Sequence, residues 1–207
     1  MSEESGPTPI GGRRRVSTEG IVAAAAELFA RDGYHAVGMR DIAEALGIRG
    51  ASLYHHYSSK EEILFAVCRT VTAEPVAQNL PLLDAEGSPT SRLSALIRAH
   101  LRHLAARRVE YLVGLHELSA LTPEHRASVH DHRRYYHRRV RDVIVAGTRS
   151  GEFSVPDAGL AALALLDTLN GIAGWYRAEG TRTLDKVADG YVTLLVGGLL
   201  GARRPGA

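Results

Sequence analysis

Polar side chains between residues 38 and 60 are the strongest candidates for chemistry in this sequence, and they suit contact with a nucleic acid. The segment reads GMRDIAEALGIRGASLYHHYSSK. An arginine such as Arg40 can donate two hydrogen bonds to one guanine, and a serine such as Ser52 can donate to a base or accept from it. A phenol such as Tyr54 and an ammonium such as Lys60 suit the oxygen atoms of a phosphate. Together these residue types could read base edges and hold the backbone of a duplex.

Two short helices joined by a tight turn are needed to present these side chains, and the apolar residues predict them. The first helix has apolar residues at i, i+3, i+4 and i+7, namely Met39, Ile42, Ala43 and Leu46. Gly47 ends that helix, and Ile48 and Leu53 anchor the second helix to the same core. The residues left facing outward are Arg49, Gly50, Ser52, Tyr54 and His55. This pattern predicts a helix-turn-helix, whose second helix enters a major groove.

From residue 13 to residue 71 the sequence resembles the TetR family of bacterial repressors. The resemblance rests on the spacing of Ala24, Phe29, Gly33, Tyr34, Ile42, Ala43, Gly47, Leu53, Tyr54, His56 and Lys60. It implies an all-α fold with an N-terminal three-helix helix-turn-helix domain and a C-terminal helical domain for ligand binding and dimerisation. It also implies a regulator whose partners are a double-stranded DNA operator, a small-molecule effector and a second copy of the chain.

The resemblance implies a set of DNA contacts. In the family, the residues at the positions of Tyr54 and Lys60 clamp the DNA backbone, and Gly50 stands where a base-reading residue is usual. Because glycine has no side chain, base reading is expected to fall to its neighbours. The expected DNA-binding residues are Arg40, Arg49, Gly50, Ser52, Tyr54, His55, His56 and Lys60. The alternatives are a half-buried core aromatic for Tyr54 and stabilisation of the short helix by His56.

The chain is expected to have three parts: a flexible tail at residues 1–16, the DNA-binding domain at 17–60, and an effector-binding and dimerisation domain at 61–203. The tail is rich in proline and glycine. The three arginines at residues 13–15 form either an arm that approaches phosphates or the minor groove, or a solvated run before the first helix.

Start and stop signals predict the helices. Either Ser17 or Thr18 can cap a first helix, which Gly33 ends. Residues 58–62 have the spacing of a capping box and begin a long fourth helix, which Pro75 bends or ends. Residues 79–89 are rich in helix breakers and predict a loop between the DNA-reading unit and the rest. Further helices are expected at 90–107, 109–120, 123–150, 157–178 and 184–201.

Residues 167–198 resemble the branch of the family that responds to acyl-CoA thioesters. In that branch the residues matching Trp175 and Arg177 lie near the ligand and the subunit contact. The basic residue often found just before the tryptophan is replaced here by Ala173 and Gly174.

An arginine-rich stretch of the expected helix at 123–150 has residue types that can hold phosphates and stack on a ring. Its members are Arg133, Arg134, Tyr135, Tyr136, Arg138, Arg139 and Arg141. We take Arg134 and Arg138 as ligand-binding candidates, with a solvated helix face as the alternative. Tyr111 and His116 are further candidates for the lining of an effector cavity, although a histidine of the helical core is the commoner outcome.

The last two expected helices carry small residues beside leucines, a combination that lets helices approach closely. The small residues are Ala161, Ala162, Gly171, Gly174, Gly197 and Gly198. The leucines that supply apolar area are Leu160, Leu163, Leu166, Leu169, Leu194, Leu195 and Leu199. This pattern favours a dimer interface; the alternative is a core within one subunit.

Composition excludes several classes of protein. The chain has 207 residues of which 45% are hydrophobic, so it can bury a substantial core. Its formal net charge of +2 is too small to indicate DNA binding by itself, which therefore depends on where the cations lie. The single cysteine, Cys68, excludes an intrachain disulfide and favours a reducing compartment. There is no secretory signal at residues 1–9 and no apolar run of about 20 residues, so we expect a cytoplasmic protein without a membrane partner.

Metal and catalytic sites are not expected, and neither is a cofactor. His130 and His132 are two residues apart and cannot face one ligand on a helix, while His100 and His103 lack a set of further ligands. No phosphate loop, nucleophile elbow or carboxylate pair is visible. The hypothesis is a ligand-responsive repressor that binds a palindromic operator as a dimer and is released by a small hydrophobic or acyl-CoA-type effector. The alternatives are a repressor of a drug exporter that senses apolar cations, and a helical enzyme or adaptor.

Overall fold

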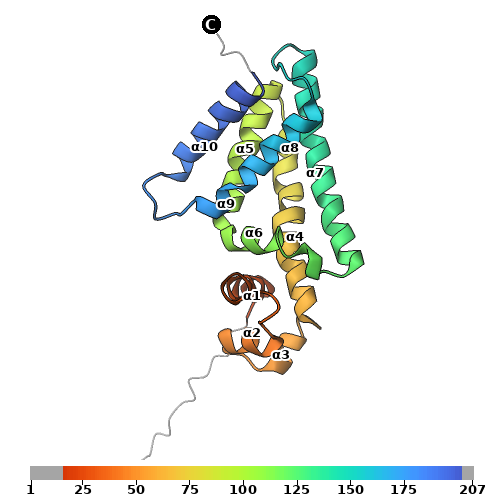
Figure 1. Cartoon of the computed structure of the whole chain (residues 1–207), viewed down its shortest axis with the longest axis vertical. Coiled ribbons are helices and arrows are strands. Elements are labelled where there is room, and N and C mark those ends of the chain that lie inside the picture. Colours follow the sequence, from red (N-terminus) through yellow and green to blue (C-terminus); the bar gives the residue numbers. More distant parts are fainter. Residues whose placement is uncertain (1–15, 202–207) are drawn as a thin grey trace, which may run out of the picture.

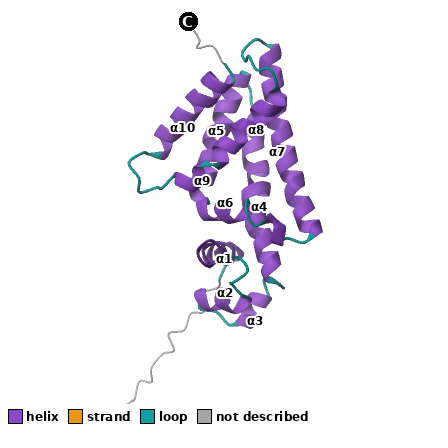
Figure 2. Ribbon diagram, in the orientation of Figure 1, coloured by secondary structure: helices purple, strands orange, loops and turns teal. Residues whose placement is uncertain are grey.

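The structure, a computed structural model, describes residues 16–201, and every regular element in that range is a helix (Figures 1 and 2). The arginine run at residues 13–15 and nearly all of the expected tail lie outside the described residues. Helices α1 to α3 gather at one end of the molecule, α4 runs from them into a larger bundle, and the long α7 lies beside it (Figure 1).

The first unit consists of α1 (Thr18–Asp32), α2 (Met39–Ala45) and α3 (Gly50–Tyr54). The hydroxyl of Ser17 accepts a hydrogen bond from the backbone N–H of Gly20 at 3.1 Å and so caps α1. Gly33 and Gly47 follow α1 and α2 with φ angles of 85° and 65°, a region that favours glycine. The helix-turn-helix predicted from the sequence is therefore present.

Helix α4 (Lys60–Asn79) joins this unit to the rest of the chain. The hydroxyl of Ser59 accepts from the N–H of Glu62 at 3.2 Å, which caps the helix at the expected place. Pro75 lies inside α4 without ending it, and its ring is buried. The segment after α4 is not a loop between two units, because Leu80 and Leu83 of η1 (Leu80–Leu83) are buried in the larger bundle.

The larger bundle contains the remaining elements. They are α5 (Pro89–Ala106), α6 (Arg108–Gly114), η2 (Leu118–Ala120), α7 (Pro123–Arg149), α8 (Ala158–Asn170), α9 (Ile172–Trp175), α10 (Leu184–Val192) and the π-helical η3 (Thr193–Leu199). The expected helix at 109–120 is interrupted after Gly114, and this break lets Leu121 turn into the core of the first unit. The expected helix at 157–178 is interrupted at Gly171 and ends before Tyr176, whose backbone is extended and whose ring is buried.

Two apolar cores share α4. The core of the first unit takes side chains from α1 to α3 and from α4 as far as Cys68, together with Val113, Leu121 and Val129 from the larger bundle. The second core begins on α4 at Val71. The first unit therefore packs directly against α6 and α7 and is not separated from the larger bundle by a linker.

One stretch within residues 16–201, Ala158–Trp175, is long and apolar enough to cross a membrane by length and composition, with a mean hydropathy of 1.3. Only 33% of it is buried in the subunit, and the helix is interrupted within it at Gly171. Length and composition of a single stretch are weak grounds for a membrane span, since helices of water-soluble proteins pass the same test.

Candidate DNA-binding face and ligand cavity

The helix-turn-helix presents its polar residues to solvent. Ile42 and Leu53 are completely buried and hold α2 and α3 against α1. The exposed residues on this face are Arg40, Arg49, Gly50, Ser52, Tyr54, His55 and His56. Tyr54 is 56% exposed, so its ring is not part of the core. These side chains are free to meet a duplex, as the DNA-binding prediction requires.

Lys60 is the one expected DNA contact that is half-buried. Its ammonium donates hydrogen bonds to the backbone carbonyl of Tyr34 at 2.7 Å and to that of Val37 at 2.6 Å. It also lies 4.3 Å from the centre of the Tyr34 ring. Lys60 therefore ties the start of α4 to the loop between α1 and α2. An ammonium has three N–H groups, so one remains for a phosphate, and that role stays a prediction.

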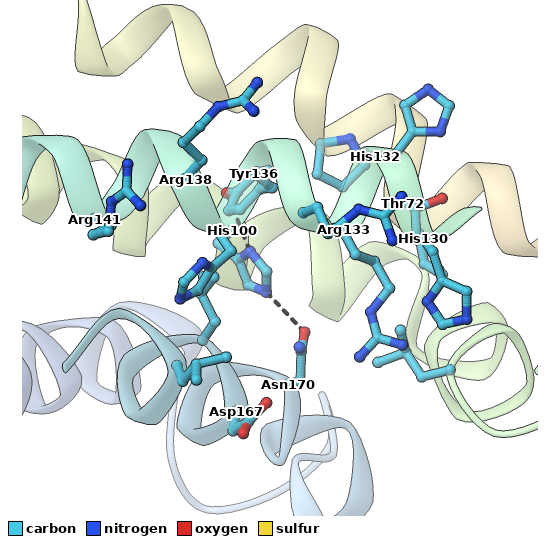
Figure 3. A pocket seen from close by; sticks show the side chains of 17 residues that line it. Thr72, His100, His130, His132, Arg133, Tyr136, Arg138, Arg141, Asp167 and Asn170 are labelled. Atoms are coloured by element: carbon cyan, nitrogen blue, oxygen red, sulfur yellow. Dashed lines mark hydrogen bonds between the residues drawn. The ribbon is translucent and has the colours of Figure 1, made fainter. Parts of the chain in front are cut away.

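A cavity of about 570 Å³ lies between α4, α5, α7 and α8 (Figure 3). Its apolar lining comes from Val71, Pro75, Leu115, Leu163 and Leu166. Helix α7 supplies a set of arginines and histidines to its lining, namely His130, His132, Arg133, Arg134, His137, Arg138 and Arg141. Among residues 16–201, Asp167 is the only acidic residue that lines it. The cavity thus joins an apolar interior to a basic wall, in which Arg134 is ion-paired with Asp131 and Arg141 with Asp142.

Three hydrogen-bonded polar side chains, those of His100, Tyr136 and Asn170, line this cavity. The Nε2 of His100 lies 3.2 Å from the amide oxygen of Asn170, and its Nδ1 lies 3.3 Å from the hydroxyl of Tyr136 (Figure 3). Because the amide oxygen only accepts, Nε2 carries the proton and Nδ1 accepts from the tyrosine. Burial lowers the pKa of His100 to about 4 and raises the pKa of Tyr136, so both are neutral near pH 7.

The structure brings two of the six ligand-binding candidates to the cavity, Arg134 and Arg138. Tyr111 is buried elsewhere, with its hydroxyl 3.1 Å from Nδ1 of His103, and His116 is exposed away from the cavity.

Trp175 and Arg177 also lie away from the cavity. The indole of Trp175 is 46% exposed and stacks on Tyr191, with 6.5 Å between the ring centres. The guanidinium of Arg177 donates to the backbone carbonyl of Tyr176 at 3.0 Å. These positions leave any contact of Trp175 and Arg177 with a ligand or a partner subunit as a prediction.

The cavity residues that sequence reasoning missed are His100, Asn170 and the buried hydroxyl of Tyr136. They come from α5, α8 and α7, so no local spacing connects them. A signal did exist on α7, where cavity-lining residues recur at intervals of three or four between positions 130 and 141. Arg139 is outside that set and pairs instead with Asp84 at 2.6 Å.

Two polar joints connect the DNA-reading unit with the bundle in the described part of the chain. The carboxylate of Glu61 accepts from the backbone N–H of Thr122 at 2.8 Å and lies 2.9 Å from Nδ1 of His125. The ring of His125 also stacks on Phe65 at 3.8 Å between centres. The second joint is an ion pair between Glu19 and Arg107 at 2.5 Å, with Glu19 largely exposed. The first joint fixes the start of α7, the helix that also forms the basic cavity wall, to the start of α4.

Comparison with known proteins agrees with this architecture. Residues 21–67 match the family described as "Bacterial regulatory proteins, tetR family", and residues 86–199 match the family described as "Tetracyclin repressor-like, C-terminal domain". The HTH-type transcriptional repressor KstR2 of Mycobacterium tuberculosis is 30% identical over 177 residues, which cover 84% of this chain and 88% of that protein.

Solved structures show the same similarity over nearly the whole chain. A tetR-family regulatory protein from Rhodococcus RHA1 has a TM-score of 0.82 and 30% identity, covering 90% of this chain and 98% of that one. AibR, solved in complex with isovaleryl coenzyme A and operator DNA, has a TM-score of 0.76 and 28% identity, covering 90% of this chain and 99% of AibR. The helix-turn-helix, the helical bundle and these matches together show that the chain belongs to the TetR family of transcriptional repressors.

Proposed function

We propose that this repressor binds a palindromic operator as a homodimer in the cytoplasm and is released by an anionic amphiphile of the acyl-CoA type. The observation that supports this effector class is the cavity itself, which combines an apolar interior with a wall of arginines on α7. Its volume of about 570 Å³ suits a small-molecule ligand. AibR, which has the same fold, was solved with isovaleryl coenzyme A.

The charge of the cavity argues against an apolar cation. Among the described residues, four arginines and one carboxylate, that of Asp167, line it. Arg134 and Arg141 are paired with Asp131 and Asp142, which leaves Arg133 and Arg138 as the lining arginines without an ion pair in the described part of the chain. A cationic ligand would be repelled by the wall, while phosphate oxygens can accept two parallel N–H bonds from one guanidinium. The neutral pair His100 and Asn170 suits an uncharged polar group such as a carbonyl. The ligand we propose therefore has an anionic end at α7 and an apolar end against Val71 and Leu166.

The dimer is proposed from an apolar surface on α8 and η3. Leu160 and Leu194 are each 66% exposed, and Leu163 and Leu199 are also exposed. A Cβ atom at Gly197 would meet nothing within 4 Å, so this glycine is not required for packing inside the subunit. Exposed leucines beside small residues are what a close helix contact between two subunits needs. Such a dimer would hold two α3 helices for half-sites about 34 Å apart.

Release of DNA is proposed to pass along α7. An anion would bind to residues 133–141 of α7. The start of α7 is hydrogen-bonded to Glu61, which lies in the first turn of α4 beside the helix-turn-helix, so a change in the tilt of α7 would be transmitted to α4. A ligand that binds one tilt of α7 better than another shifts the population of DNA-binding dimers. Glu61→Ala should therefore keep binding to both DNA and ligand but lose at least half of the ligand-induced release, measured by fluorescence anisotropy of a labelled operator.

The proposal is tested by selecting an operator from random duplexes with the full-length protein and then adding isovaleryl-CoA, oleoyl-CoA, free CoA or tetraphenylphosphonium. An acyl-CoA should release the operator and the cation should not. Arg134→Gln and Arg138→Gln should each weaken acyl-CoA binding about tenfold, the value of one charge-assisted hydrogen bond. Arg139→Gln is the matched control, because Arg139 lies on the same helix and is ion-paired with an aspartate, as Arg134 is, but does not line the cavity. Release by tetraphenylphosphonium alone would overturn the effector class in favour of a cation sensor.

A further inference from the structure

An open groove of about 370 Å³ separates α2 from α3 on the DNA-binding face. Its floor is apolar, formed by Met39, Ala43 and Ile48, and its rim carries Arg40, Glu44 and Tyr54. The groove runs past Gly50, one helical turn before Tyr54 on the same side of α3. It therefore lies among the side chains expected to meet base edges.

Neither the backbone nor the packing requires a glycine at position 50. The φ angle of Gly50 is not in the left-handed region, and a Cβ atom built there would have no atom within 4 Å. Glycine is also less favourable than alanine within a helix. The fold therefore does not require a glycine here. Because Gly50 lines the groove and a Cβ there would point into open space, its absence of a side chain keeps the groove accessible, and a large side chain could reach over it.

We propose that this groove receives the 5-methyl group of a thymine, and that Gly50 makes the operator specific for thymine at that position. This inference rests on the DNA binding of the proposed function. In the major groove the methyl group of thymine is the only apolar feature that distinguishes one base pair from another. An apolar floor without a donor or an acceptor suits that group and offers nothing to a purine edge. Arg40 at the rim remains available for a guanine beside it.

The experiment begins with the operator selected from random duplexes by the full-length protein. Each thymine is then replaced in turn by deoxyuridine, which removes the methyl group and leaves the base pairing unchanged. At one symmetric pair of positions, this replacement should weaken binding about fourfold per half-site, which corresponds to the free energy of burying one methyl group. Replacing the same thymine by 5-methyldeoxycytidine, paired with guanine, should retain more affinity than replacing it by unmethylated deoxycytidine.

Two variants connect the effect to the groove. Gly50→Leu should fill the groove and bring the affinity ratio between thymine and deoxyuridine duplexes close to one. Ala51→Leu places the same leucine side chain at the next exposed residue, which does not line the groove, and should leave the ratio unchanged. Circular dichroism melting verifies that both variants are folded.

The possible outcomes separate the inference from the function on which it rests. If no duplex is enriched, the proposed operator binding itself fails. If an operator is found but no deoxyuridine replacement changes the affinity, the thymine inference is overturned and operator binding stands. The thymine inference is also overturned if Gly50→Leu leaves the affinity ratio between thymine and deoxyuridine duplexes unchanged. It is equally overturned if Ala51→Leu lowers that ratio as much as Gly50→Leu does.

Discussion

Lys60, a predicted DNA contact, also has a structural role, because its side chain holds the loop between α1 and α2. Its ammonium donates to the carbonyls of Tyr34 and Val37 at 2.7 and 2.6 Å and lies over the Tyr34 ring. Lys60→Met removes the charge and both hydrogen bonds but keeps an apolar stem of similar length. The carbonyls that it frees lie at a partly exposed site, where water can replace part of what is lost.

The expected cost follows from these contacts. A hydrogen bond from a charged donor contributes about 1.5–3 kcal/mol when buried, and the cation–π contact about 0.5–1 kcal/mol when exposed. Allowing for water at a half-buried site, we expect Lys60→Met to lower the free energy of unfolding by about 2 kcal/mol. For a chain of this length the melting temperature should fall by about 4–8 °C.

Urea unfolding and thermal melting measure this loss, with the exposed Lys186→Met on α10 as control. An unfolding free energy equal to that of the control would refute the structural role of Lys60. The phosphate role has its own readout, because loss of one phosphate contact should weaken all duplexes alike and lower the slope of log affinity against log salt by about 0.9. An unchanged slope would remove Lys60 from the DNA contacts.

Three further predictions follow from the bundle. Leu194→Glu places a charge on the exposed apolar surface and should shift the protein from dimer to monomer in analytical ultracentrifugation, with its helical content unchanged. Burial lowers the pKa of His100 to about 4 in the folded protein, whereas a histidine of the unfolded chain has a pKa of about 6.5. Between these values the unfolded chain binds the proton and the folded protein does not, so the free energy of unfolding should decrease by up to about 3 kcal/mol from pH 6.5 to pH 4. His100→Gln should flatten that dependence in urea unfolding, and an equally steep curve would contradict the assignment. Gly147→Ala places a Cβ 2.1 Å from the ring of Phe153 and should destabilise the protein by about 2 kcal/mol or more in the same assay, whereas a neutral result would mean that the ring moves aside.

Local patterns predicted the parts of the fold that local interactions determine. The apolar spacing at residues 39–46 falls on α2, and the glycines at 33 and 47 follow helix ends as predicted. For the caps, the sequence left Ser17 or Thr18 and Ser58 or Ser59 open, and the structure places Ser17 and Ser59 at the helix starts. The breaks after Gly114 and at Gly171 were not predicted. They depend on which core Leu121 and Tyr176 must reach, and that is a property of packing between distant segments.

The candidate sites divide in the same way. A short helix held by Leu53 leaves its other residues exposed by geometry alone, so the sequence by itself determined which residues form the candidate DNA-binding face, and it also indicated the family to which the chain belongs. Tertiary structure decided which arginines of α7 line a cavity, and that Arg139, which does not line it, pairs with Asp84. It also decided that His100 meets Asn170, seventy residues away, and that Lys60 is directed toward carbonyls of its own chain. A helical period specifies the face on which a residue lies, but only the packed neighbours determine what that face meets.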